Sequence, residues 1–187
     1  MGGEIHIDST VLELCRKGDS RAFRALVEQL KRPAYYQALA LLGNHDDALD
    51  ISQEAFVKTW QSLHSFDLTW PFYPWYYTIL KRLALNALRA RGRRHEASAD
   101  ERAWEEPLDS ADNEEARQVY RTSILVHQVM AKLTVDDREI ISLKDVQDYA
   151  YKDIAIILGI PTGTVMSRLY TARARFKKML QETNYDQ

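Results

Sequence analysis

Seven aromatic residues fall within the twelve positions from 66 to 77, directly before a basic segment. Pro71 and Pro74 interrupt the middle of this stretch and predict an irregular loop there. Rings in such a loop can stack on unpaired bases while neighbouring cations hold the phosphates, which is how single-stranded DNA is bound. We expect Trp75 and Tyr76 to be core residues. The rings that we expect at the surface, in contact with bases, are Trp70, Phe72 and Tyr73.

The segment that follows has six basic residues and no acidic residue between positions 80 and 94. In a helix, residues at positions i, i+4, i+7 and i+11 lie on one face. Cations on that face would follow the phosphates, and the amide of Asn86 has the donor and acceptor atoms that a base edge requires. The residues of this predicted DNA-binding face are Arg82, Asn86, Arg89 and Arg93.

A second basic segment is preceded by the spacing of a helix-turn-helix. Residues 151–170 read YKDIAIILGIPTGTVMSRLY, with the small Ala155 where two helices must approach closely. Gly159 can take the positive φ of a tight turn between the helices, and Val165 can pack the second helix against the first. This spacing predicts a DNA-binding motif whose second helix enters the major groove. An ordinary helical hairpin is the alternative interpretation.

The outward face of that second helix is polar and basic, and residues 154–180 include five bases and no acid. Hydroxyl groups and arginine near the helix start can reach base edges and phosphates, and the later basic side chains can hold the DNA backbone. The predicted DNA-contacting residues are Thr162, Thr164, Ser167, Arg168, Thr171, Arg175 and Lys178.

A cluster of carboxylates stands on the opening turns of another predicted helix. Negative side chains there favour the positive end of the helix dipole, so helix capping is one interpretation, and a docking face for a basic partner is a second. A divalent-metal site in an all-helical phosphohydrolase is a third, but it needs carboxylates on a neighbouring helix, where residues 23–42 offer only Glu28. The cluster is formed by Asp46, Asp47, Asp50 and Glu54, with Gln53 on the same face as the last three.

Hydrophobic spacing predicts helices almost everywhere and no strand. We expect a helix that begins near Asp19, a break or kink at Pro33, and a helix end at Gly43. Further helices are expected from about 46 to 63, from 75 to 91, and from 120 to 180 with the turn at Gly159.

Residues 95–116 interrupt the helical pattern with nine acids and one base. This stretch has too little apolar surface to offset the entropy of ordering, so it predicts a linker. The expected fold class is all-α, with two small helical domains. We place the first domain at 5–92, the acidic linker at 93–117 and the second domain, which contains the helix-turn-helix, at 118–182.

The composition of the 187 residues is that of a globular protein, with 45% hydrophobic and 28% charged residues. The single Cys15 cannot form an internal disulfide, and the N-terminal MGGEIHIDST has no basic or apolar run of the kind that a signal peptide needs. We therefore expect a cytoplasmic protein that is not inserted in a membrane. The five histidines show no ligand spacing, so we expect neither a metal site nor a cofactor.

Three of these segments together resemble the sigma-70 family of transcription initiation factors, in particular its small two-domain extracytoplasmic-function (ECF) group. DDALDISQEAFVKTWQSLHSF resembles the segment of region 2.2 that binds core polymerase. FYPWYYTILKRLALNALRARGRR resembles regions 2.3 and 2.4, which melt the promoter and read its −10 element. The stretch from Leu133 to Leu180 resembles region 4, which reads the −35 element.

The resemblance implies a sigma factor that binds core RNA polymerase and promoter DNA and has no active site of its own. Asp47, Asp50, Gln53 and Glu54 would dock on the clamp helices of the polymerase β′ subunit, and region 4 would meet the β flap. The loop of residues 70–73, with Arg82 and Asn86, would hold flipped −10 bases, and the helix from Thr162 would lie in the −35 major groove. The acidic linker would run near the RNA exit path, and an anti-sigma factor would inhibit the protein.

The chain differs from common family members at four positions. Leu49 stands where an acid is common, Arg82 where Asn is frequent, Asn86 where Asp is frequent, and Met166 where Lys is common. A stand-alone helix-turn-helix regulator is the main alternative function, but it leaves the aromatic stretch and the acidic cluster without a role.

Overall fold

The computed structural model describes residues 7–95 and 114–185, without the side chains of residues 93–95, 114–121 and 184–185. Within these ranges the chain folds into eight α-helices, one 3-10 turn and one π turn, and no strand is present. The expected all-α fold is confirmed. Among the described residues, no single helix has the length and apolar content needed to cross a membrane, although the bent pair α7 and α8 passes that test together.

The first helical domain is a bundle of four α-helices with polar caps at their N-termini. Asp8, Asp19 and Asn44 each accept a hydrogen bond from a backbone N–H in the following first turn. Gly43 ends the second helix with a φ of 70°, as its position in the sequence predicts. The helices are α1 (Ser9–Arg16), α2 (Ser20–Leu42), α3 (His45–Ser62) and α4 (Phe72–His95).

The break expected at Pro33 is absent, because α2 runs through the proline as one helix of 23 residues. Leu26, Leu30, Ala34, Ala38 and Leu41 form a fully buried stripe at helical spacing on both sides of the proline. The burial of this stripe against α3 and α4 outweighs the one backbone hydrogen bond that a proline removes.

The helix α4 begins earlier than expected, at Phe72 rather than Trp75. Pro74 lies in its first turn, where a backbone N–H has no acceptor within the helix, so the missing donor costs little. The two prolines therefore mark the beginning of a helix and not the middle of a loop.

The second helical domain contains the predicted helix-turn-helix. Gly159 has a φ of 65° in the turn, and α7 and α8 lie at 98° to each other across it. Thr134 caps α6 by accepting from the N–H of Asp137 at 3.2 Å. The elements are α5 (Glu114–Lys132), α6 (Val135–Ile141), a π turn (Ser142–Val146), α7 (Tyr151–Leu158) and α8 (Thr162–Tyr185).

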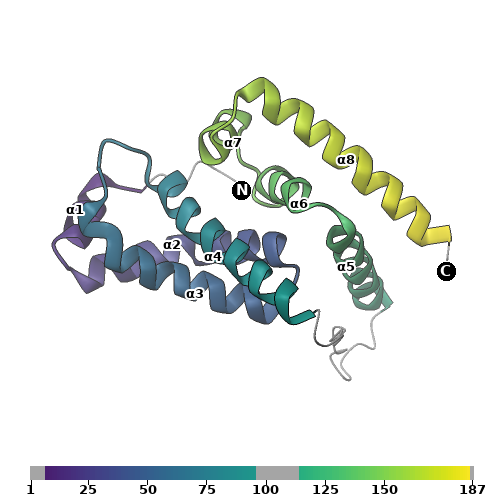
Figure 1. The fold of residues 1–187 in the computed structure, drawn as a ribbon, viewed down its shortest axis with the longest axis horizontal. Coiled ribbons are helices and arrows are strands. Elements are labelled where there is room, and N and C mark those ends of the chain that lie inside the picture. Colours follow the sequence, from purple (N-terminus) through teal and green to yellow (C-terminus); the bar gives the residue numbers. More distant parts are fainter. Residues whose placement is uncertain (1–6, 96–113, 186–187) are drawn as a thin grey trace.

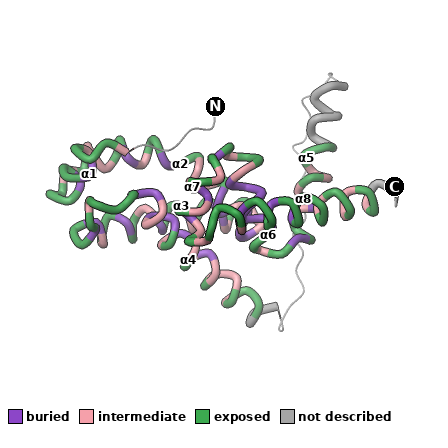
Figure 2. Tube along the Cα trace, turned by 90° about the horizontal axis from the view of Figure 1, so that it is seen from above, coloured by how far each residue is buried: buried purple, intermediate pink, exposed green. Residues whose placement is uncertain are grey.

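The two domains pack against each other. The helix α6 contacts α2, and α7 contacts α4, so that α6 and α7 lie between the first bundle and α8 (Figure 1). Buried positions concentrate where these helices meet, whereas the ends of α4 and α8 are mostly exposed or half-buried (Figure 2). One continuous hydrophobic core therefore joins residues of both domains.

Candidate polymerase and nucleic-acid interfaces

The helix α3 presents its acidic cluster to solvent. Its buried side carries only small residues, Ala48, Ser52, Ala55 and Thr59, which let it pack closely against α2 and α4. Opposite them, Asp50, Gln53 and Glu54 are exposed. Asp47 is half-buried, and its carboxylate lies 3.5 Å from Nη1 of Arg91 on α4. Three of the four predicted docking residues are thus fully available to a partner.

Three large apolar side chains on the same helix are exposed. Leu49 is 38% exposed, Val57 54% and Trp60 37%. A partner that docks on the acidic cluster would also cover these groups, which adds an apolar component to the contact. The signal was present in the sequence, because α3 has more large apolar residues than one buried face can hold.

The aromatic stretch divides into one exposed ring and several buried ones. Trp70 is 70% exposed, as expected. Our expectation that Phe72 and Tyr73 lie at the surface is wrong, because they are 4% and 5% exposed. As residues of the first turn of α4, they point into the core. Phe72 packs edge-on against Phe66 with ring centroids 5.5 Å apart.

Tyr73 is covered by the second domain. Its ring stacks on that of Tyr149 at 5.5 Å, with 27° between the ring planes. Burial raises the pKa of Tyr73 to about 12. Tyr76 is buried, as expected, whereas Trp75 is half-buried at the edge of the core.

The basic face of α4 is exposed beside the second domain. Arg82, Asn86 and Arg89 are all exposed, and Nη1 of Arg89 donates to Oδ1 of Asn86 at 3.1 Å. A cavity of about 520 Å³ lies over this face, and Ile157 and Leu158 of α7 form its other wall. The backbone of Arg93 continues α4, but its side chain lies outside the described residues.

The helix α8 has the two faces that the sequence predicts. Val165, Leu169 and Ala172 are buried at helical spacing and fix the helix on α6 and α7. The predicted DNA-contacting residues lie on the other side, exposed except for the half-buried Thr164: Thr162, Thr164, Ser167, Arg168, Thr171, Arg175 and Lys178.

The exposed side of α8 is partly ordered by its own hydrogen bonds. The hydroxyl of Ser167 donates to the carbonyl of Thr164 at 3.1 Å, and that of Thr171 donates to the carbonyl of Ser167 at 3.0 Å. Arg175 pairs with Asp137 of α6 at 2.8 Å. Arg168 has no such partner among the described residues, so its guanidinium is free to bind an acceptor.

The geometry of the acidic cluster on α3 does not support a metal site. Among the residues that the structure describes, no group of three or more histidine, cysteine, aspartate or glutamate side chains could hold a metal ion. The cluster on α3 faces solvent rather than a neighbouring row of carboxylates.

Known proteins share both domains with this chain. The family model of sigma-70 region 2 matches residues 26–94, and that of sigma-70 region 4 matches residues 123–176. The RNA polymerase sigma-H factor of Pseudomonas aeruginosa is 33% identical over 181 residues, which cover 93% of this chain and 94% of the relative. The chain belongs to the sigma-70 family.

Two further relatives carry the ECF designation. The ECF RNA polymerase sigma factor SigW of Bacillus subtilis is 31% identical and covers 89% of this chain and 93% of its own. The sigma-E factor of Escherichia coli is 30% identical, with 93% and 94% covered. The protein is thus an ECF sigma factor, which directs transcription initiation and is not an enzyme.

Two solved structures have a similar fold. RpoE of Bartonella quintana, solved with the anti-sigma factor NepR, matches with a TM-score of 0.64 and 26% identity over 85% of this chain and 96% of its own. CnrH, solved with the cytosolic domain of CnrY, has the same TM-score and identity over 94% of this chain and 97% of its own.

Proposed function

We propose that this ECF sigma factor binds core RNA polymerase through the acidic face of α3 and reads its promoter with α4 and α8. The observation that carries the proposal is that two helices in separate domains, α4 and α8, each expose a basic face without acidic residues between positions 80 and 94 and between 154 and 180. Basic faces of this kind favour polyanion binding, and two of them in separate domains suit two elements on one duplex.

The core-binding face consists of Asp47, Asp50, Gln53 and Glu54. Their carboxylates would meet the clamp helices of the β′ subunit, and the exposed apolar groups beside them would be buried in the same contact. The second domain would meet the β flap. This arrangement assigns a role to a surface that a stand-alone DNA-binding regulator would not need.

The −10 element would be read by Trp70 together with the basic face of α4. Stacking on an exposed ring is worth about 1–3 kcal/mol per base, which offsets the cost of a few kcal/mol for taking a base out of the duplex. Phe72 and Tyr73 can take part only if the second domain moves away and α4 presents them. Arg82, Asn86, Arg89 and Arg93 would hold the strand.

The −35 element would be read by α8 in the major groove. Side chains near its N-terminus, from Thr162 to Arg168, would contact base edges, and Arg175 and Lys178 would hold phosphates. Binding at this site fixes the position of the first domain over the −10 element, so promoter recognition needs both contacts.

We also propose where this sigma factor acts and what inhibits it. Core polymerase and promoter DNA are in the cytoplasm, and we place this protein there. Because RpoE of Bartonella quintana was solved with the anti-sigma factor NepR, we propose that an anti-sigma factor also inhibits this chain. The domain limits 5–92, 93–117 and 118–182 belong to the same proposal.

Binding to purified bacterial core RNA polymerase tests the α3 face. We expect a stoichiometric complex with the wild-type chain and at least about tenfold weaker binding for Asp50→Ala with Glu54→Ala, since charged contacts at an interface are each worth about 1 kcal/mol or more. Glu13→Ala with Glu28→Ala, which removes two exposed carboxylates outside α3, is the matched control and should bind core within about twofold of wild type. Equal binding by the double variant would show that α3 is not the docking face.

A further inference from the structure

Two large apolar side chains are exposed on the helix that would read the −35 element. Met166 is 54% exposed and Tyr170 is 78% exposed. They stand one turn apart on α8, so they share one flank of the helix. Val165 and Leu169 enter the hydrophobic core from another side of α8, and neither Met166 nor Tyr170 belongs to that core. Neighbouring apolar groups that are left exposed in this way favour a partner that covers them.

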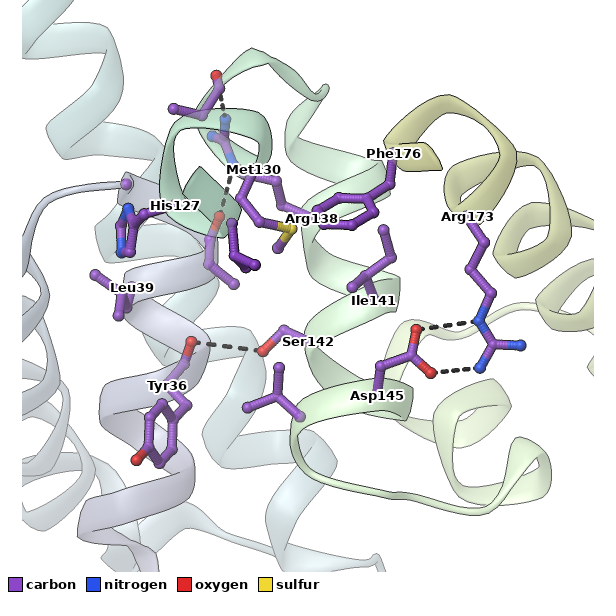
Figure 3. Close-up of a pocket in the computed structure, with 15 residues that line it drawn as sticks. Tyr36, Leu39, His127, Met130, Arg138, Ile141, Ser142, Asp145, Arg173 and Phe176 are labelled. Atoms are coloured by element: carbon purple, nitrogen blue, oxygen red, sulfur yellow. Dashed lines mark hydrogen bonds and ion pairs between the residues drawn. The ribbon is translucent and has the colours of Figure 1, made fainter. Parts of the chain in front are cut away.

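The helix α8 is fixed to the rest of its domain by two pairs of arginine and aspartate. Nε of Arg173 donates to Oδ2 of Asp145 at 3.1 Å, and Nη2 of the same arginine donates to Oδ1, so a bidentate pair joins α8 to the π turn (Figure 3). Arg175 pairs with Asp137 of α6 at 2.8 Å. The helix therefore presents Met166 in a defined orientation, which direct contact with a base edge requires.

The hydroxyl groups beside the two apolar side chains use their hydrogens within the protein. Ser167 and Thr171 each donate to a backbone carbonyl of α8. Arg168 is two residues from both Met166 and Tyr170, and side chains at that spacing do not face each other on a helix. This flank of α8 therefore meets a ligand mainly through apolar atoms.

The base edges of the major groove carry one apolar group, the 5-methyl group of thymine. The other groups exposed there, such as N7 and O6 of guanine or N4 of cytosine, need a hydrogen-bond partner. A methionine side chain has no donor, so placing it over guanine would remove water from N7 and O6 without replacing it. Its flexible thioether can instead pack closely against a methyl group. Thymine is therefore the base that an exposed methionine in the groove favours.

We propose that Met166 selects a thymine of the −35 element by packing against its 5-methyl group, and that Tyr170 extends the same apolar contact by one helical turn. The inference rests on the proposed function, in which α8 lies in the major groove. It adds a specificity-determining contact to the polar contacts already assigned to α8. Because Arg168 projects from a different side of the helix, the two side chains contact separate groups of the DNA.

Deoxyuridine tests this contact by the change of a single methyl group. It differs from thymidine only in the missing 5-methyl group and pairs with adenine in the same way. The probes are promoters recovered from a randomised pool with the holoenzyme of core polymerase and the full chain. Each thymine of the −35 block, on either strand, is replaced in turn, and holoenzyme binding to the fluorescent duplex is measured. We expect at least one replacement to weaken binding by the wild type about fourfold, the effect of removing one methyl group from an apolar contact.

Variants of Met166 show whether this side chain is the partner of the methyl group. In Met166→Ala, the same replacement should change binding by less than about 1.5-fold, because the partner is already missing. Met166→Leu keeps an apolar side chain of similar volume and should retain the effect of about fourfold. Lys177→Ala, an exposed change elsewhere on α8, is the matched control and should retain it as well. Because residue 166 is exposed, its variants should keep the urea midpoint of the wild type.

A lysine at the same position should change which base is selected. Its ammonium group can donate to O6 and N7 of guanine. Promoter selection with Met166→Lys should therefore replace thymine by guanine at the position that deoxyuridine identifies, and the −10 block should stay as it is with the wild type.

A selected −35 block without thymine would overturn the proposal, and so would effects of deoxyuridine that are equal in the wild type and Met166→Ala. In both cases, −35-dependent binding that Arg168→Ala weakens would show that the proposed function of α8 still holds. A holoenzyme that selects no −35 block would contradict the proposed function itself, and the inference with it.

Discussion

At the scale of single residues, the most direct prediction concerns Arg168. It lies on the exposed side of α8, without an ion-pair partner among the described residues, so it can meet a base edge or a phosphate. We expect Arg168→Ala to reduce transcription that depends on the −35 element by about tenfold or more, since a good base contact is worth about 1–3 kcal/mol. Run-off transcription with saturating core polymerase measures this.

The matched control is Lys177→Ala, an exposed basic residue on the same helix outside the predicted contact set. It should leave −35-dependent transcription within about twofold of wild type. Undiminished output from Arg168→Ala would mean that a different face of α8 enters the groove.

The residue scale also shows what local sequence signals miss. We expected Phe72 and Tyr73 at the surface because Pro71 and Pro74 predict a loop. Pro74 instead lies in the first turn of α4, which tolerates a proline. The contacts that Arg138 and Glu139 of α6 make with the first domain had no signal in the sequence. Their partners, Ala40, Leu41, Tyr77 and Lys81, are distant along the chain, and only the folded arrangement brings them together.

At the scale of elements, the turn between α7 and α8 was predictable because it depends on one residue. Gly159 has a φ of 65°, and nothing lies within 4 Å of the position that a Cβ would occupy. The cost of Gly159→Ala is therefore conformational rather than steric. We expect it to lower the free energy of unfolding by about 1–2 kcal/mol, as measured by urea denaturation.

Gly163 provides the comparison, because it lies in the first turn of α8 without a positive φ and with open space around its Cβ position. Gly163→Ala should leave stability unchanged or raise it by up to about 1 kcal/mol. Equal effects at both glycines would mean that the left-handed turn does not restrain the helix-turn-helix.

Elements were harder to predict where packing rather than a local signal decides their limits. The helix α2 continues through Pro33 because a buried stripe runs along its whole length. The exposed Val57 and Trp60 on α3 follow from the small residues on its other side, which leave no room for large ones in the core. Hydrophobic periodicity alone cannot tell which face of such a helix the core occupies.

At the scale of the whole molecule, the all-α class and the family were predictable, since three motifs occur in the order that the sigma-70 family uses. The placement of one domain on the other was not, because the contacts between them join residues far apart along the chain. Among the residues predicted to read the −10 element, Tyr73 is buried against Tyr149 of the second domain, whereas Trp70, Arg82 and Asn86 stay exposed.

The measurement that tests the central claim most directly is run-off transcription with purified core polymerase and this chain on a pool of randomised promoters. We predict new transcripts that require the chain, and two conserved sequence blocks in the recovered templates, near −35 and −10. Arg168→Ala should relax only the −35 block, and Trp70→Ala only the −10 block. Tight DNA binding without core-dependent transcripts would contradict the account and favour a stand-alone regulator.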